Sequence, residues 1–335
     1  MQDDKGGYRQ INKALNICAF EDYLKVQTAS LPRIADVEKL TGRVLRILGQ
    51  NPGKFTLQGT NTYILGTGPR RILIDTGGGE PRWMKLVETT LKSKGISLSH
   101  VLLTHWHGDH TGGVPDLLRV YPHLRNSIYK NDPGNGQQNI IDGQVFHAEG
   151  ATVRAVHTPG HSEDHMCFIL EEERAMFTGD NILGHGTSAV EDLGIFMATL
   201  QKMYEQKCVT GHSAHGLPIS DLPNKLAGEL QGKLRRERQV MNALGRFRSR
   251  GARSVTIKDL VSEIYGYTIH EETRTLALEP FIDEVLRKLA VDGKVAFERR
   301  GSLKKWYSVA AAQTSPGEVK ISSTVQVQVQ EILVE

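Results

Sequence analysis

The densest group of possible ligand side chains lies in residues 104–110, THWHGDH. His105 and His107 are two residues apart, so in an extended segment both side chains point the same way. Asp109 and His110 follow at once and can face a second position. Burying four such groups without a partner is costly, whereas two adjacent cations would satisfy them. Imidazole and carboxylate ligands without a thiolate suit zinc, manganese or iron.

Three further candidates follow, each at the end of a predicted strand. His161 lies in HTPGHSEDH, Asp180 in FTGDN and His212 in VTGHSAHG. Loop residues at strand ends converge at one edge of a sheet sandwich, and Asp180 is placed to bridge two ions. We therefore expect seven ligands to meet there: His105, His107, Asp109, His110, His161, Asp180 and His212.

Short strands separated by Gly and Pro must position these side chains. A helix over 81–95 begins with Pro81 and ends at Gly95, which suit a first turn and a C-cap. Two more helices are expected directly after Pro115 and over 194–206. Because strands dominate, we predict a two-sheet core with helices on its outer faces. The predicted strands cover 43–48, 61–66, 70–77, 100–104, 144–150, 152–160, 166–172, 174–180 and 207–212.

The character of the chain changes near Gly232. Three helical segments and a hairpin with Gly301-Ser302 at its turn follow, which is the order of a winged-helix module. Residues 231–310 hold 17 Lys and Arg against 10 Asp and Glu, a net charge of 17 − 10 = +7. We expect four parts: an N-terminal helical arm (1–40), a catalytic domain (41–230), a winged-helix-like domain (231–310) and a tail (311–335).

The overall composition excludes several classes of protein. In 335 residues, 41 Lys and Arg oppose 38 Asp and Glu, and a net charge of +3 argues against a dedicated polyanion binder. No apolar run approaches the roughly 18 residues that span a bilayer. Cys18, Cys167 and Cys208 form no Cys-x-x-Cys pair, which favours a reducing compartment over a disulfide framework. The first ten residues lack the apolar stretch of a secretory signal. We therefore expect a cytoplasmic protein without membrane contact.

The motifs together resemble those of the metallo-β-lactamase superfamily. THWHGDH is preceded by LIDTG, which contains Asp75, and is followed by TPGHS, FTGD and TGHS, so the likeness covers about residues 40–220. It implies an αββα sandwich with two divalent metal ions, Zn²⁺ foremost and Mn²⁺ as the alternative. Asp75 matches a carboxylate that supports the ligands. His215 rivals His212 for the last motif, and the Gly-His context favours His212.

The resemblance also implies how the ligands divide. One metal would take His105, His107 and His161, the other would take Asp109, His110 and His212, and Asp180 would lie between them. Asp109 would in addition be the catalytic residue, orienting the attacking water and accepting its proton.

A narrower likeness points to a substrate. NPGKFTLQGTNTYILGTGPRRILIDTG and the winged-helix tail are similar to lactamase-like mitochondrial endoribonucleases and to fungal polyketide thioesterases. GYRQINKALNICAFEDYL resembles the atrochrysone carboxyl ACP thioesterases, which implies release of an aromatic polyketide acid from the acyl carrier protein of a non-reducing polyketide synthase. The arm and the basic tail would then dock the acidic carrier.

Hydrolysis of a small glutathione thioester is one alternative, but the long arm and tail favour a bulkier substrate. Two further hypotheses compete with the polyketide thioesterase. A single-stranded RNA endonuclease could use the same metals and the +7 tail, although the tail has no aromatic ladder for base stacking, so a nucleic-acid partner is not favoured. A non-catalytic scaffold that binds a synthase is the other, and the complete ligand set argues against it.

Overall fold

The computed structural model describes residues 31–134 and 136–309. Residues 1–30 of the expected helical arm, which include Cys18, and the expected tail (311–335) lie outside the described residues.

The first sheet has seven strands in sequence order, β1 to β7. Neighbours are antiparallel as far as β4 and parallel from β4 to β7. The boundary expected between residues 40 and 41 separates β1 from its hydrogen-bonded partner β2. The strands are β1 (Val37–Lys39), β2 (Val44–Leu48), β3 (Asn61–Leu65), β4 (Arg70–Ile74), β5 (Ser97–Leu102), β6 (Ile128–Lys130) and β7 (Gln138–Asn139).

The second sheet has five strands in the order β12-β11-β10-β9-β8. All neighbours are antiparallel except β11 and β12, which run parallel. The strands are β8 (Val145–Ala148), β9 (Ala151–His157), β10 (Met166–Leu170), β11 (Ala175–Gly179) and β12 (Thr210–Ser213).

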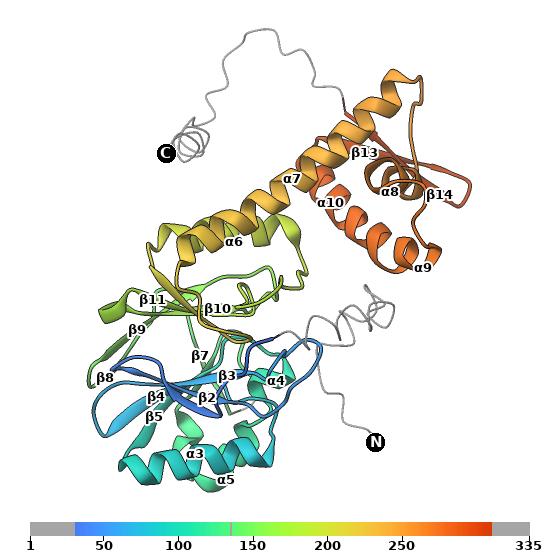
Figure 1. Cartoon of the computed structure of the whole chain (residues 1–335). Helices are drawn as coiled ribbons and strands as arrows, with labels where there is room; N and C mark the ends of the chain where they lie inside the picture. The colour runs from blue at the N-terminus through green and yellow to red at the C-terminus, as the bar shows by residue number, and fades with distance from the viewer. Residues whose placement is uncertain (1–30, 135, 310–335) are drawn as a thin grey trace, which may run out of the picture.

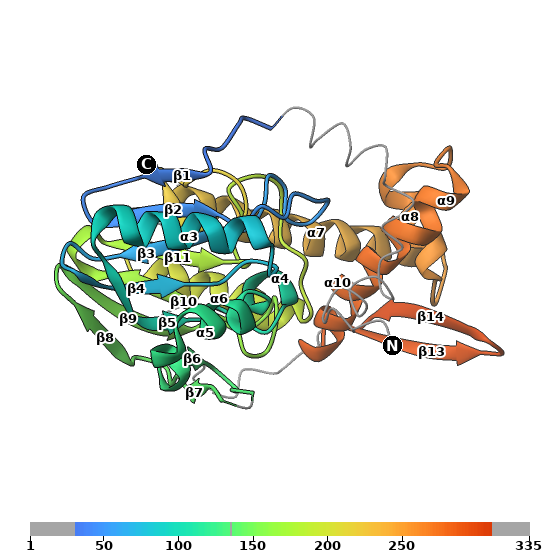
Figure 2. The ribbon, with the colours of Figure 1, turned by 90° about the horizontal axis from the view of Figure 1, so that it is seen from below.

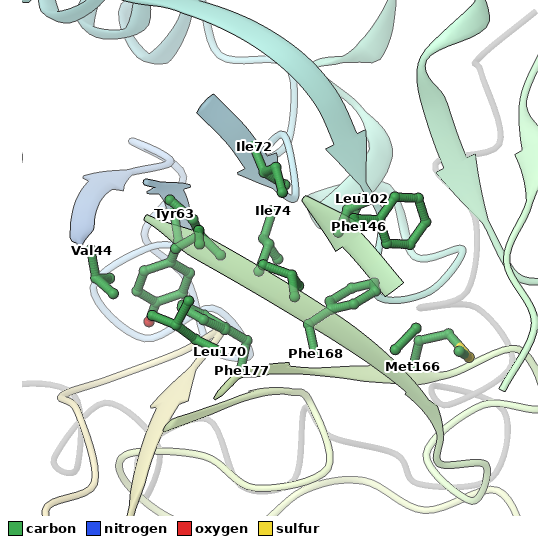
Figure 3. Packing of buried hydrophobic residues seen from close by; sticks show 14 of the residues in the cluster. Val44, Tyr63, Ile72, Ile74, Leu102, Phe146, Met166, Phe168, Leu170 and Phe177 are labelled. Atoms are coloured by element: carbon green, nitrogen blue, oxygen red, sulfur yellow. The ribbon is translucent and has the colours of Figure 1, made fainter. Parts of the chain in front are cut away.

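Apolar side chains from both sheets form the central core (Figure 3). Tyr63 of β3 meets Phe177 of β11 edge to face, with ring centroids 4.9 Å apart. Phe168 and Leu170 of β10 are fully buried beside them. Alternation along each strand supplies this inner face, because successive side chains point to opposite sides of a sheet.

Helices cover the outer face of each sheet, giving four layers (Figure 1). On the first sheet lie α3 (Pro81–Lys94), α5 (Val114–Val120) and the 3₁₀ turn η2 (Pro122–Asn126). Trp83 of α3 is fully buried and donates to Thr62 Oγ1 at 3.0 Å. On the second sheet lies α6 (Leu193–Glu205), whose buried face packs in one core with β10 and β11. The short 3₁₀ turn η3 (Glu171–Glu173) connects these two strands. The predicted αββα sandwich is confirmed.

The C-terminal module continues from a long helix, α7 (Leu222–Ser249). This helix begins beside α6 and runs on into the module (Figures 1 and 2). The boundary expected between residues 230 and 231 therefore falls inside one helix. The other elements are α8 (Ile257–Tyr265), α9 (Glu271–Thr273), the π-helical segment η4 (Arg274–Leu278), α10 (Glu279–Val291), β13 (Val295–Arg300) and β14 (Leu303–Ser308).

One hydrophobic core joins this module to the sandwich. Leu244, Leu260, Leu286 and Trp306 are buried together with Met197 of α6. Along the described parts of the chain, no helix is both long and apolar enough to cross a membrane.

Candidate metal centre

The ligands come from loops that leave both sheets at the same edge of the sandwich. Residues 104–110 follow β5 and enter the short helix α4 (Gly108–Thr111). His161 follows β9, Asp180 follows β11 and His215 follows β12. All of these histidine and aspartate side chains are buried, with Asp180 the most exposed at 8%. Two sheets thus bring together side chains that are more than 100 residues apart in the sequence.

The first group consists of His105, His107, His161 and Asp180, whose ligand atoms all lie within 4.8 Å of one another. His107 Nδ1 lies 2.8 Å from His105 Nε2 and 3.0 Å from His161 Nε2. Asp180 Oδ2 is 3.5 Å from His161 Nε2 and 4.0 Å from His105 Nε2. Three imidazole nitrogens and one carboxylate oxygen therefore point at one position.

The second group consists of Asp109, His110 and His215. Asp109 Oδ2 lies 3.3 Å from His110 Nε2 and 3.2 Å from His215 Nε2. The other oxygen of Asp180, Oδ1, reaches the same two nitrogens at 3.3 and 3.1 Å. Asp180 thus presents one oxygen to each group, which is the arrangement of a bridging carboxylate.

Several of these atoms are buried and have no hydrogen-bond partner. They include Asp109 Oδ1, Asp180 Oδ1, His110 Nε2 and His215 Nε2. Leaving buried polar atoms unsatisfied is unfavourable, and such a group in a native protein calls for a water or an ion. Five imidazoles and two carboxylates without a thiolate suit divalent cations such as zinc or manganese. The residues present fit a pair of metal ions.

The electrostatics of the first group favour neutral ligands. Burial lowers the pKa of His105 well below its usual value and lowers that of His107 to about 3. Burial also lowers the pKa of His161. Neutral imidazole is the form that binds a metal, so these three rings are ready to do so at neutral pH.

The second group carries more negative charge. Burial alone would raise the pKa of Asp109, yet the neighbouring His110 and His215 outweigh it and hold this pKa well below its usual range. Burial alone would lower the pKa of His215, but Asp180 and Asp109 raise it to about 9. The carboxylates thus draw protons onto the imidazoles, and a bound cation would take the place of those protons.

Residues around the ligands fix their orientation. Asp75 Oδ2 accepts from His110 Nδ1 at 2.8 Å, which leaves Nε2 facing the second group. The same carboxylate accepts from the Thr104 hydroxyl at 2.9 Å and, through Oδ1, from the Thr104 backbone N–H at 2.8 Å. His161 Nδ1 lies 2.8 Å from the Ala189 carbonyl. Partners of this kind set the tautomer and basicity of a ligand.

The structure brings six of the seven predicted ligands together and leaves His212 outside both groups. His212 lies within β12 opposite Phe177, so its ring faces the sandwich core. It stacks on Phe177 at 4.9 Å, and burial, followed by repulsion from Arg46, lowers its pKa to about 4. His215, the rival residue in the same motif, occupies the position expected for His212.

The strand boundary explains this difference. The predicted strand ended at residue 212, whereas β12 runs to Ser213. The other ligands follow the last residue of their strand, as Asp180 does directly after β11. A strand extended to Ser213 would have favoured His215.

One supporting pair was not anticipated from the sequence. Lys130 at the end of β6 and Asp164 in the loop after His161 form a buried ion pair, with 6% and 5% of their surfaces exposed. Ser162 also donates to Asp164 at 2.8 Å. The pair ties the loop that carries His161 to the first sheet. No local sequence signal pairs these two residues, because they lie 34 positions apart in the chain.

Comparison with known proteins gives this geometry a family. The metallo-beta-lactamase superfamily matches residues 55–217. An atrochrysone carboxyl ACP thioesterase from Claviceps purpurea is 70% identical over 92% of this chain and 100% of its own length. A protein of the same name from Emericella nidulans is 63% identical over 92% of this chain and 98% of its own.

Solved structures agree on the fold. A beta-lactamase domain protein from Burkholderia ambifaria has a TM-score of 0.64 at 17% identity, covering 84% of this chain and 95% of that one. A metallo-beta-lactamase family protein from Thermus thermophilus has a TM-score of 0.57 at 18% identity, covering 81% and 100%. With its ligand groups, its four layers and these full-length relatives, the chain belongs to the metallo-β-lactamase superfamily and, within it, to the family of the atrochrysone carboxyl ACP thioesterases.

Proposed function

We propose that the protein is a metal-dependent thioesterase that hydrolyses a polyketide thioester on an acyl carrier protein and releases the free polyketide acid. The observation that carries this proposal is the 70% identity across the whole length of a relative named for that activity. The site supports it, because Asp180 joins two buried ligand groups with its two oxygens.

Each group would hold one divalent cation, and Asp180 would contribute to both. Cations bound there would lower the pKa of a water molecule and polarise the thioester carbonyl. The donor set is compatible with Zn²⁺, which we favour, and with Mn²⁺.

The protein residues have separate tasks in the hydrolysis. Asp109 is deprotonated, and the Thr60 hydroxyl donates to its Oδ2 at 3.2 Å, which leaves Oδ1 to orient the attacking water and accept its proton. Addition of the water oxygen to the carbonyl carbon is followed by cleavage of the C–S bond. The thiolate leaves with the bonding electrons and takes up a proton, so the products are a carboxylic acid and a carrier thiol.

The partner in this proposal is the acyl carrier protein domain of a non-reducing polyketide synthase. We also propose a cytoplasmic location, since Cys167 and Cys208 are buried free thiols and such thiols are typical of a reducing compartment.

The direct test compares two substrates. The purified, metal-loaded protein is incubated with a polyketide-loaded carrier protein and, separately, with single-stranded RNA. Release of the polyketide acid without RNA cleavage is the expected result. Cleavage of RNA without release of the polyketide acid would refute the thioesterase proposal and favour the RNA endonuclease.

A further inference from the structure

Two neighbouring cations of α7, one buried and one half-buried, form no ion pair with the described residues. Lys233 is only 7% exposed, and Arg236 is half-buried with its guanidinium 4.0 Å from the centre of the Phe281 ring. Neither forms an ion pair with any residue that the structure describes. Buried charges are normally paired, so this pair of cations requires an explanation.

The nearby carboxyl groups of Glu229 and Glu284 compensate the two cations only in part. Glu229 is engaged with Lys225 at 3.0 Å. Glu284 of α10 has a buried Oε1 without a hydrogen-bond partner. Burial raises the pKa of Glu284 and lowers that of Lys233, as expected where charges are poorly compensated.

The two cations belong to a stripe that leads away from the metal centre. Lys225, Glu229, Lys233 and Arg236 are spaced four, four and three residues apart, so they share one face of α7. At the start of this stripe, Lys225 donates to the carbonyl of Gly186, in the loop that leads to the partners of His161.

Lys233 is also separated by one residue from the loop that carries His161. Its ammonium is 5.4 Å from the centre of the Phe196 ring. Phe196 packs on Gly160, where an added Cβ would lie 2.6 Å from Phe196 Cα. Gly160 directly precedes the metal-site residue His161. The cations are therefore near the centre but separate from it.

We infer that Lys233 and Arg236 bind the phosphate of the phosphopantetheine arm that carries the acyl group. This inference rests on the proposed function. An extended pantetheine unit separates the thioester sulfur from the phosphate by on the order of 15 Å, from standard bond lengths. Phe196 and Gly160 lie between Lys233 and His161, so a phosphate bound at Lys233 would leave the thioester end free to reach the metal centre.

The chemistry of the pair suits a phosphodiester. An arginine presents several donors in a planar fork, and a lysine adds a compact charge, so together they can bind non-bridging phosphate oxygens. The exposed Arg235 and Arg238 also form no ion pair within the described part of the chain, but they lie on other faces of α7. They provide matched controls of the same charge on the same helix.

The test compares a small acyl-phosphopantetheine thioester with the same acyl-pantetheine, which lacks the phosphate. For the wild type we expect kcat/KM to be about tenfold or more higher for the phosphorylated substrate, the value of one charge-assisted hydrogen bond. Lys233→Met combined with Arg236→Met should bring the two substrates within about twofold. Hydrolysis of acyl-pantetheine should stay unchanged, and Arg235→Met with Arg238→Met should keep the preference.

Thermal unfolding separates binding from a structural role. Removing a buried charge that is only partly compensated should leave the melting temperature of Lys233→Met unchanged or higher. A lower melting temperature with equal loss on both substrates would mark a structural residue and overturn the inference. Equal wild-type kcat/KM values for both substrates would refute the phosphate-binding inference without contradicting the proposed thioesterase function. Failure to cleave either thioester, with cleavage of single-stranded RNA that depends on Lys233, would overturn both.

Discussion

Replacing His215 tests which histidine near β12 belongs to the metal centre. His215 Nε2 lies 3.2 Å from Asp109 Oδ2 and 3.1 Å from Asp180 Oδ1. Loss of a residue that merely orients a ligand costs about 10–100-fold in metal affinity or activity. Loss of the ligand itself in His215→Ala should therefore lower kcat/KM by at least about 100-fold. Bound metal should fall from about two equivalents toward one.

His212→Phe is the matched variant. The two ring nitrogens of His212 are buried without a hydrogen-bond partner, and removing such atoms recovers about 1–3 kcal/mol. The larger phenyl ring costs about 1–3 kcal/mol through crowding. These effects oppose each other, so the free energy of unfolding should change by less than about 2 kcal/mol. The phenyl ring can keep the stacking on Phe177.

Thiol release from an acyl-pantetheine thioester measures activity, and elemental analysis measures metal. We expect His212→Phe to keep both and His215→Ala to lose both. The opposite pattern, with metal and activity lost in His212→Phe and retained in His215→Ala, would refute the assignment of His215.

Three further changes test residues around the centre. Asp75→Ala should lower activity and metal affinity by about 10–100-fold, measured by kcat/KM and by competition with a chelator, because the ring it orients is free to turn. Cys167→Ala and Cys208→Ala should keep full activity, since burial raises the pKa values of these thiols to about 12 and about 11 and they are protonated at neutral pH; covalent labelling of either by substrate would contradict the mechanism. Lys130→Met should lower the free energy of unfolding by about 3–5 kcal/mol, because it leaves the buried carboxylate of Asp164 without its cation. Unfolding in denaturant measures this change, and an unchanged midpoint would show that the ion pair contributes nothing to stability.

Local patterns predicted much of the fold. The helix over 81–95 was expected from Pro81 and Gly95, and α3 is capped by Gly95 in the left-handed conformation, φ 61°. Thr256 precedes α8, and its side chain accepts from the Asp259 backbone N–H at 3.1 Å in a capping box. Such features depend on residues within one turn of each other, so the sequence alone contains them.

What could not be predicted depends on long-range pairing. The end of β12 is determined by its parallel register with β11, and no local signal separates a strand that ends at 212 from one that ends at 213. The early start of α7 depends on burial of Leu222 and Leu226 in the core beside α6. The position of a residue along a strand decides to which face of the sheet its side chain points. Because the predicted strand ended one residue too early, His212 was expected at the site instead of His215.

The charges of the second ligand group predict how metal removal changes stability with pH. In the metal-free protein the pKa of His215 is raised to about 9, against about 6.5 in an unfolded chain. A raised folded-state pKa contributes stability that is fully present below pH 6.5 and is lost as pH rises through 9. The difference corresponds to about 3 kcal/mol for this one group.

Metal-loaded protein should lack this dependence, because a bound cation holds the imidazoles in their neutral form. Asp109 and Asp180 do not change stability in this pH range. Their folded pKa values lie well below the usual range, so the stability that they contribute is lost only in acid. We expect the melting temperature of chelator-treated protein to fall between pH 6.5 and 9 by more than that of the loaded protein. His215→Ala should reduce the fall. Parallel curves for chelated and loaded wild type would show that the carboxylates do not hold protons on the second group, and the argument that a cation replaces those protons would then fail.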